Sequence, residues 1–265
     1  MNQSENRREV LMETFEPLSV AKLSITDIGL GADCLAKLYF KLKYGPEPPK
    51  GATITGSAFH RGVEVGLREI AKKGKLPPLD TCTDAYRDLF YAASLDANFE
   101  DSKPREWEKK GLDAIRVYHE KAMPTFEPED EGCIERPFAV ITASGRKITG
   151  KIDLVLPDRI VDHKTTSSSS LKNAAKGMQY LGYQLPLEEP TTFEYSVVNF
   201  RGRYERFAFT PSAEAVRNFV ALAERLMILL ENGLIIPNPR SFLCSEKWCA
   251  WYKRCPFSRS LWGVY

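Results

Sequence analysis

The first half of the chain carries apolar residues at helical spacing. Between residues 24 and 44 they recur every three or four positions, which places them on one face of an amphipathic helix. Ser24 or Thr26 provides a side-chain oxygen that can cap the start of this helix. Segments with two consecutive prolines interrupt the pattern and are loops, since proline lacks the amide that a helix needs. We therefore expect helices at 24–44, 57–73, about 82–98 and about 104–122.

After Pro128 the pattern changes to the alternation that is typical of strands. Short β-rich runs are separated by Ala143-Ser-Gly-Arg146, Pro157-Asp158 and Arg201-Gly202, which are typical of turns. We expect strands at 133–142, 147–156, 159–163, 191–200 and 203–209, and helices at about 171–185 and from Pro211 to Gly233. This order of elements predicts an α/β core with an N-terminal helical insertion.

The composition is that of an ordinary globular protein. The 265 residues are 43% hydrophobic and 27% charged, which excludes wholesale disorder and fibrous repeats. Lys and Arg number 37 against 35 Asp and Glu, and the formal charge of +2 excludes a histone-like polycation. A local basic groove is still compatible with this balance, because net charge says little about where the charges lie.

The sequence also predicts where the protein works. No apolar run reaches the roughly 18–20 residues that span a bilayer, so we expect no membrane partner. The N-terminus is polar and lacks the apolar stretch of a secretion signal, so we expect a cytoplasmic protein. In that compartment the six cysteines are expected to be thiols or metal ligands rather than disulfides.

Two carboxylates interrupt the apolar β-rich runs. Asp153 lies in Gly-Lys-Ile-Asp-Leu-Val, and Asp162 lies in Ile-Val-Asp-His-Lys-Thr, where Lys164 follows two residues later. Because strand side chains alternate between faces, Asp162 and Lys164 emerge on the same face. If the two strands pair, both carboxylates converge beside the lysine. Two close carboxylates repel each other and favour a divalent cation such as Mg²⁺, which polarises a phosphodiester and activates a water.

The acid-x-lysine spacing has a simpler interpretation, an exposed ion pair at the end of a strand. Asp101-Ser-Lys103 and Glu108-Lys-Lys110 show the same spacing in segments that we expect to be solvated. The neighbouring Asp153 argues against this interpretation, because a carboxylate within an apolar strand is costly unless it is used.

Together, the segments around Asp153 and Asp162 resemble those of the PD-(D/E)xK nuclease superfamily, in its RecB-like branch. That branch includes the AddB-type and CRISPR-associated iron–sulfur exonucleases. The resemblance covers about residues 20–258. It implies a restriction-endonuclease-like fold, in which helices flank a mixed central sheet, with an N-terminal helical insertion and a C-terminal cysteine-bound metal-cluster region. It also implies a Mg²⁺- or Mn²⁺-dependent deoxyribonuclease, an exonuclease that hydrolyses DNA from its ends, often on single strands.

The resemblance assigns roles to particular residues. Residues 56–64 match the Gly-x-x-x-His-x-x-x-Glu pattern of the branch, in which His60 binds the catalytic metal. The implied metal ligands are His60, Asp153, Asp162 and the backbone carbonyl of His163. Lys164 is expected to orient the attacking water, and Glu64 to act as a further carboxylate near the metal. On the residues alone, His60 has a simpler interpretation, a helical histidine that makes a local hydrogen bond.

A second helical motif follows the lysine. Gln179 and Tyr183 match the branch's Gln-x-x-x-Tyr pattern and lie four residues apart, on one face of a helix. The resemblance implies that they position the active-site strand and the DNA backbone. Gln and Tyr are also common on amphipathic helices, so this motif indicates little by itself.

Three of the six cysteines fall within twelve residues, at Cys244, Cys249 and Cys255. Thiolates at this density favour a soft metal, and a fourth ligand must come from elsewhere in the chain. The resemblance places this ligand at Cys34 and implies a [4Fe–4S] cluster on the four residues. A Cys₄ zinc site and free thiols are the alternatives. The remaining two cysteines are expected to be small core residues.

We expect four parts along the chain. They are a mobile leader at 1–18, a helical part at 19–130 with Cys34 and His60, a nuclease core at 131–233, and an iron–sulfur region at 234–265 that packs on the first helix. The last part carries cations beside aromatic rings, which suits phosphate contacts and base stacking. These residues are Lys247, Lys253, Arg254 and Arg259 with Trp248, Trp251, Tyr252 and Trp262. An equally good interpretation is that the rings bury the cluster and the charges face solvent.

The expected partner is DNA, single-stranded or with free ends, and the family allows a homo-oligomer or a protein partner in DNA processing. The pathway stays open between recombination, repair and phage or CRISPR DNA processing. The alternative from another class is a non-catalytic nucleic-acid-binding or adaptor protein with a structural Cys₄ metal site. The complete set of His, Asp, Asp and Lys favours the enzyme, since an inactive site has no reason to keep all four.

Overall fold

A computed structural model describes residues 15–95, 97, 99, 103–173 and 177–258. The chain groups into two spatial units, each assembled from segments that are far apart in the sequence. The first unit comprises Met1–Glu47, Ala139–Thr149 and Arg217–Tyr265, and the second comprises Pro48–Phe138 and Gly150–Val216. The four parts expected from the sequence follow chain order instead and stay a prediction.

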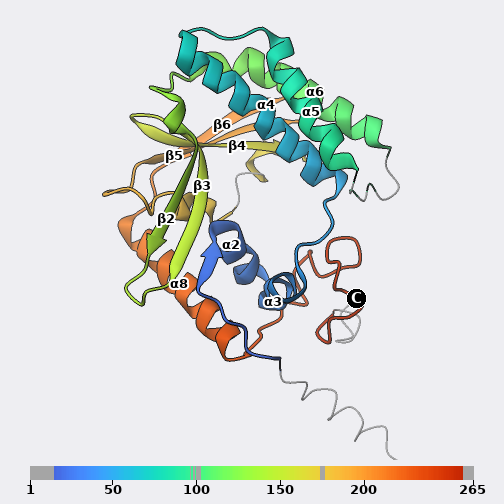
Figure 1. Cartoon of the computed structure of the whole chain (residues 1–265), viewed down its shortest axis with the longest axis vertical. Helices are drawn as coiled ribbons and strands as arrows, with labels where there is room; N and C mark the ends of the chain where they lie inside the picture. Colours follow the sequence, from blue (N-terminus) through green and yellow to red (C-terminus); the bar gives the residue numbers. More distant parts are fainter. Residues whose placement is uncertain (1–14, 96, 98, 100–102, 174–176, 259–265) are drawn as a thin grey trace, which may run out of the picture. The chain divides into compact units, whose positions relative to one another are not determined.

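Three long helices open the second unit. They are α4 (Gly51–Lys73), α5 (Leu79–Ser94) and α6 (Pro104–Lys121), which lie side by side (Figure 1). α4 and α5 approach closely because α4 carries Gly62 at their contact, where a Cβ would lie 2.7 Å from the Cys82 carbonyl oxygen. α4 ends before Gly74, which adopts the left-handed conformation that favours glycine. The helix end expected at Gly74 is therefore confirmed, although α4 begins six residues earlier than expected.

The sheet is mixed. β3 (Lys147–Val155) pairs with β2 (Ile134–Ile141) and runs antiparallel to β4 (Arg159–Thr166). β4 pairs in parallel with β5 (Thr192–Asn199), and β5 pairs antiparallel with β6 (Tyr204–Phe209). Buried residues of α4, α5 and α6 share one hydrophobic core with residues of β3, β4 and β5. The α/β class with a mixed sheet flanked by helices is thus confirmed.

Aromatic rings cover the sheet near β5 and β6. Tyr180 belongs to the short helix α7 (Gln179–Gly182), and its ring packs 5.0 Å from Phe209 of β6. Tyr183 packs 5.9 Å from Phe193 of β5. The long helix expected at 171–185 is wrong, because only a 3₁₀ turn (Leu171–Asn173) and α7 occur there, while 174–176 lie outside the described residues. The apolar positions of this segment serve packing onto the sheet rather than a continuous helix.

The first unit begins with a short strand and two helices. β1 (Lys22–Ser24) was not expected from the sequence and pairs in parallel with the start of β3. α2 (Ile25–Asp33) starts with a capping box in which the Ser24 hydroxyl accepts a bond from the Asp27 amide, so the expected Ser24 cap is confirmed. The single helix expected at 24–44 is wrong, because Cys34 is extended (φ −153°, ψ 104°) and α3 (Leu35–Tyr44) starts after it.

The rest of the first unit comes from later in the chain. α8 (Ala213–Glu231) enters it from Arg217 onward. The turn between β2 and β3 is tied to α8, since Ser144 donates a hydrogen bond to Glu224 and Arg146 pairs with Glu231. Among the described helices, none combines the length and the apolar character that a membrane crossing requires.

Gly111→Ala tests how closely α6 approaches α5. A Cβ at this position would lie 2.0 Å from the hydroxyl oxygen of Tyr86, whose ring is fully buried and has no room to move. Alanine favours a helix over glycine by roughly 1 kcal/mol, but we expect overpacking to dominate and to lower the free energy of unfolding by about 1–3 kcal/mol in urea titrations.

Gly29→Ala is the matched control for this variant. Gly29 is also within a helix, but no atom lies within 4 Å of the Cβ that alanine would add. This variant should leave the free energy of unfolding unchanged or raise it. Equal stability of the two variants would contradict the close packing of α5 and α6.

Candidate active site

The pairing of β3 with β4 brings the two carboxylates to neighbouring strands. Leu154 lies opposite Val161, so that Asp153 and Asp162 occupy the next positions of the antiparallel pair. Leu154 and Val161 are fully buried in the core and fix this register. As a consequence Asp153 and Asp162 are themselves only 6% and 0% exposed.

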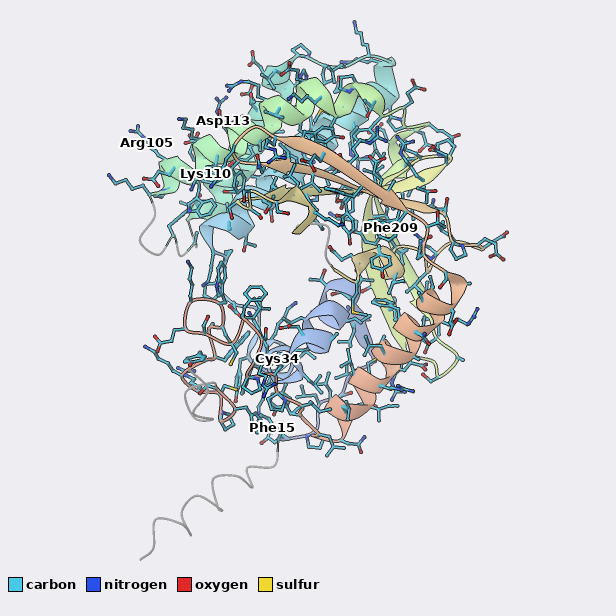
Figure 2. The ribbon with its side chains drawn as sticks, turned by 180° about the vertical axis from the view of Figure 1, so that it is seen from behind. Phe15, Cys34, Arg105, Lys110, Asp113 and Phe209 are labelled. Carbon is cyan, nitrogen blue, oxygen red and sulfur yellow. The ribbon has the colours of Figure 1, made fainter. Side chains whose placement is uncertain are left out.

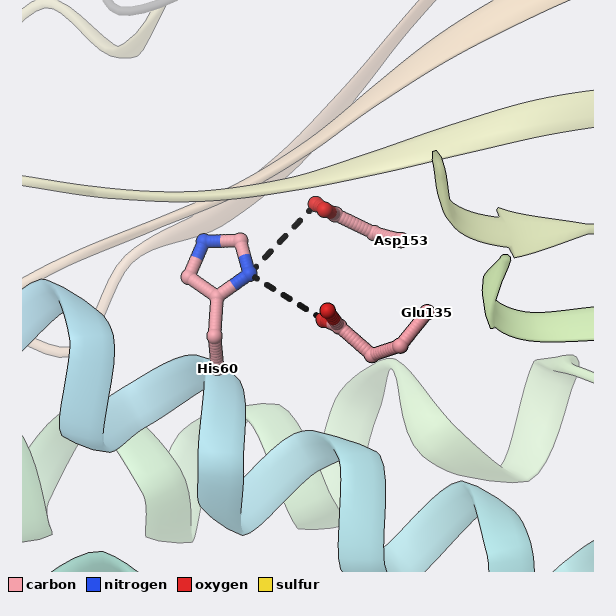
Figure 3. A group of neighbouring side chains, drawn as sticks. All are labelled: His60, Glu135 and Asp153. Carbon is pink, nitrogen blue, oxygen red and sulfur yellow. Dashed lines mark ion pairs between the residues drawn. The ribbon is translucent and has the colours of Figure 1, made fainter. Parts of the chain in front are cut away.

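α4 brings an imidazole to these strands. Its neighbours Phe59 and Val63 are fully buried in the core, which fixes the rotation of the helix. The Nδ1 atom of His60 lies 3.5 Å from the Asp153 Oδ2 atom and 4.0 Å from the Glu135 Oε1 atom (Figure 3). The ligand atoms of these three residues all lie within 4.8 Å of one another. One imidazole and two carboxylates form a donor set that suits a hard divalent cation.

The site is open on the imidazole side and closed on the carboxylate side. The His60 side chain is 30% exposed, whereas Asp153 is 7% exposed. Burial lowers the pKa of His60, and the charge of Lys164 lowers it further, so the imidazole is neutral at pH 7 with a lone pair free for a metal. A substrate or a hydrated ion can therefore reach the donor atoms from the His60 side.

A backbone hydrogen bond positions the Asp153 carboxylate, and burial makes its ionisation costly. Its Oδ2 atom accepts a hydrogen bond from the His163 amide at 2.8 Å. Burial raises its pKa to about 7, and the charge of Glu135 adds to this effect while Lys164 opposes it. In the absence of a cation the carboxyl group is thus partly protonated at neutral pH.

Asp162 and Lys164 form a buried pair. The Nζ atom of Lys164 donates hydrogen bonds to the Asp162 Oδ1 atom at 2.9 Å and to the Gln179 Oε1 atom at 2.7 Å. Burial raises the pKa of Asp162 to about 6, although Lys164 opposes it. Burial disfavours the charge of Lys164 as well, but the charges of Asp162 and Asp153 outweigh this and raise its pKa. The lysine is therefore an ammonium ion with a fixed direction.

The expected metal ligands are not equally close. His60 and Asp153 belong to the compact group that includes Glu135, and among the described residues Asp162 does not belong to it. Its Oδ2 atom is buried near Lys164 and has no hydrogen bond of ordinary geometry in the described part of the chain. A buried carboxylate oxygen in this position suits a divalent cation.

Two other expected residues have distinct environments. Burial alone would raise the pKa of Glu64, but hydrogen bonds from Arg61 and Arg68, both at 3.0 Å, outweigh it and lower that pKa. Both Glu64 oxygens are thus engaged by guanidinium groups rather than turned to His60. Tyr183 is buried, and burial followed by the charges of Asp153 and Asp162 raises its pKa, so its hydroxyl keeps its proton near the carboxylates.

Glu135 is the site residue that the sequence did not indicate. It has φ +52°, and among the described residues it is the one non-glycine residue with a positive φ. Such a conformation is strained for a residue with a Cβ, and strained residues cluster at functional sites. Glu135 also pairs with Lys151. No motif pointed to it, because its position depends on a backbone conformation that only the folded structure reveals.

The side chain of His163 is used for packing. Its Nδ1 atom lies 2.5 Å from the Tyr118 hydroxyl, which is also 2.7 Å from the Ser196 hydroxyl. Burial lowers the pKa of His163 well below its usual value, so the ring is neutral. These contacts anchor β4 between Asp162 and Lys164 and so fix the direction of both side chains.

All four expected cluster cysteines line one small cavity in the first unit. Cys34 lies at the break between α2 and α3 (Figure 2), and the other three come from the C-terminal segment. Hydrogen bonds join this segment to the break, since Asn238 donates to the Asp33 carbonyl at 2.9 Å and Ser241 donates to the Asp33 carboxylate at 2.8 Å. The break that interrupts the expected helix is therefore the feature that presents Cys34 to the other cysteines.

The positions and the pKa values of these thiols determine which metal they can bind. A tetrahedral zinc ion with bonds of about 2.3 Å places its sulfurs about 3.8 Å apart. In the described part of the chain, no three of these thiols lie within 4.8 Å of one another. Burial raises the pKa of Cys255 to about 11 and that of Cys249 as well, so the thiols need a bound metal to ionise at neutral pH. Four cysteines around one cavity form a donor set that suits a soft metal.

Comparison with known proteins bears on the fold of the chain. In the solved structures, one titled "Putative exonuclease" from Eubacterium rectale is similar, with a TM-score of 0.51 and 14% identity over 94% of this chain and 92% of that one. A structure titled SSO0001 has a TM-score of 0.46 and 15% identity over 97% and 98% of the two chains. No curated protein sequence matches the chain.

A family model covers most of the chain. It describes the PD-(D/E)XK nuclease superfamily and matches residues 22–256, a range that includes both the helix with His60 and the strands with the two carboxylates. The superfamily that the motifs resemble is thereby confirmed. By this match the chain belongs to the PD-(D/E)XK nuclease superfamily.

Proposed function

We propose that the protein is a divalent-metal-dependent deoxyribonuclease that acts as an exonuclease on the ends of single-stranded DNA. The observation that carries the proposal is the 3.5 Å approach of the His60 imidazole to the Asp153 carboxylate, next to the Asp162 and Lys164 pair. Family membership supports the reaction class. The similar Eubacterium rectale protein is described as a putative exonuclease, which favours cleavage from DNA ends.

The donor atoms fit Mg²⁺ or Mn²⁺. We assign as ligands His60, Asp153, Asp162 and the backbone carbonyl of His163, and we add Glu135 because its carboxylate shares the compact group. A cation bound there would lower the pKa of a water and offset the charge that develops on the phosphate. Glu64, with both oxygens paired to arginines, is better placed to orient α4 than to bind the metal.

Lys164 is the residue that we assign to the attacking water. Its ammonium group has three N–H donors, and Asp162 and Gln179 accept two of them. The Asp162 Oδ2 atom also lies 2.9 Å from the Nζ atom, so the carboxylate fixes the ammonium group. We assign the third N–H donor to a water or a phosphate oxygen. Gln179 is therefore a positioning residue. Tyr183 is buried with its hydroxyl near Asp153 and Asp162, and we assign it with Gln179 to the positioning of the active-site strand and the DNA backbone.

Asp153→Asn and Lys164→Ala test the catalytic assignment. Each should lower the rate of cleavage of end-labelled single-stranded DNA in Mn²⁺ by at least about 100-fold, because each removes charge that stabilises the reacting phosphate or its metal. DNA affinity, measured by fluorescence anisotropy, should stay within a few-fold of wild type. Asp158→Asn is the control, since Asp158 is exposed and its ion pair among the described residues is with the adjacent Arg159. Wild-type activity in purified Asp153→Asn would refute the assignment.

The stability of the metal-free protein should depend on pH in an unusual direction. Burial raises the pKa of Asp153 from 3.8 to about 7 in the folded state. Between these values the unfolded chain has lost the proton and the folded protein has kept it, so stability should fall as pH rises from about 4 to about 7. Mn²⁺ competes with the proton and should raise the Tm more at about pH 8 than at about pH 5. The Asp153→Asn variant should lack this contribution, and identical pH profiles for both proteins would contradict it.

We also propose that the four cysteines of the first unit hold a [4Fe–4S] cluster. The cavity that the four cysteines share supports a common thiolate metal site, and the resemblance to the iron–sulfur branch favours the cluster over zinc. Because this group joins the C-terminal segment to the α2–α3 break, its expected role is to hold a long loop closed.

Cys249→Ser tests the cluster. Protein purified without oxygen should be brown and contain about four iron atoms per chain, and the variant should lose the colour and most of the iron. Cys133→Ser is the matched control, because Cys133 is also a partly exposed thiol but does not line the cavity. Colourless wild-type protein with one zinc ion would refute the cluster and favour the zinc alternative.

A further inference from the structure

The first unit contains a second cavity, separate from the hydrolytic residues. Its volume is about 440 Å³, which is large enough for a nucleobase with its sugar. Aromatic rings from α3 and from the C-terminal segment form its wall, together with the charged side chains of Glu16, Lys43 and Arg254. Phe15, at the start of the described chain, belongs to the same wall (Figure 2).

Three rings of this wall are nearly parallel. Phe40 stacks on Tyr44 at a centroid distance of 6.1 Å with an interplanar angle of 18°, and on Trp251 at 6.1 Å with an angle of 23°. Phe40 and Trp251 are buried, whereas Tyr44 is 64% exposed. The buried rings fix the orientation of the stack. The ring of Tyr44 has the Lys43 Nζ atom 5.6 Å from its centroid, and its exposed surface offers room for a further planar group.

The charges around the rings favour an anion beside that planar group. Lys43 pairs with Glu16 at 2.8 Å, so these two charges offset each other. Arg254 is exposed and, within the described residues, has no ion-pair partner. The cavity therefore has one uncompensated guanidinium, whose planar donors match the oxygens of a phosphate.

We propose that this cavity binds one nucleotide of a single-stranded DNA, with the base stacked on Tyr44 and a phosphate held by Arg254. A base inside a duplex does not fit, because both of its faces are stacked on neighbouring bases. The inference rests on the proposed function for the identity of the nucleic acid as DNA. It adds a binding subsite that would select single strands through stacking, independently of the metal-binding residues.

Tyr44→Ala tests the subsite in the full-length protein with its cluster. Affinity for fluorescein-labelled oligo-dT, measured by anisotropy without divalent cations, should fall about tenfold, while affinity for a hairpin duplex of equal charge stays unchanged. Tyr44→Phe should keep wild-type affinity because it keeps the ring. Tyr91→Ala is the control, since Tyr91 is similarly exposed at 55% but lies on α5. Wild-type affinity of Tyr44→Ala for oligo-dT, or an equal loss for duplex, would overturn the proposal.

Arg254→Gln provides an independent test at an exposed position. A plot of the logarithm of the oligo-dT association constant against the logarithm of the salt concentration should become shallower by about one unit of slope, because one phosphate contact is lost. Competition with free dTMP separates a strand subsite from a site for mononucleotides. Displacement of oligo-dT by dTMP at concentrations near those of the oligonucleotide would refute the strand subsite.

The two proposals fail in different ways. If the wild-type protein cleaves DNA in Mn²⁺ but Tyr44→Ala binds oligo-dT normally, the nuclease proposal stands and the subsite is refuted. If the wild-type protein never cleaves DNA but Tyr44→Ala still weakens binding to oligo-dT, the subsite stands and the hydrolytic proposal is refuted.

Discussion

Two carboxylates buried in an apolar sheet are the constraint on which the site depends. Burial raises the pKa of Asp153 to about 7 and that of Asp162 to about 6, so ionising both is costly. The chain offsets part of this cost with the Lys164 ammonium and the His163 amide. In the proposed enzyme a divalent cation offsets the remainder. The two buried carboxylates therefore lower the stability of the metal-free protein, and the same two groups increase its affinity for the cation.

The strained backbone of Glu135 adds to the cost of the metal-free site. A non-glycine residue at φ +52° costs on the order of 1–3 kcal/mol, and its carboxylate adds a negative charge that further raises the pKa of Asp153. In the described part of the chain, Glu135 pairs with Lys151 and lies near the partly exposed His60. Strain that increases repulsion does not stabilise a metal-free fold. The strained conformation of Glu135 is favourable if His60, Glu135 and Asp153 bind one cation together, because the cation offsets the repulsion between the two carboxylates.

The strands of the core could be predicted from the sequence, because they follow from local alternation. The motifs indicated His60 and Asp153, which the fold brings close together, and the roles of the site residues stay a prediction. The break at Cys34 could not be predicted, since the apolar spacing of 24–44 continues through it and only the extended conformation of one residue separates α2 from α3. Glu135 was missed for the same reason. Each of these features depends on the φ of a single residue, which tertiary contacts impose and hydrophobic periodicity does not encode.

Phe40 connects the two cavities of the first unit. It lines the cysteine cavity and is also the central ring of the stack in the second cavity. Cys34 directly precedes α3, which carries Phe40 and Tyr44, and Trp251 lies between two of the C-terminal cysteines. A cluster bound by these cysteines would hold both sides of the ring stack together. Such a role needs no change of oxidation state, which explains why a hydrolytic enzyme, whose chemistry transfers no electrons, would carry an iron–sulfur group.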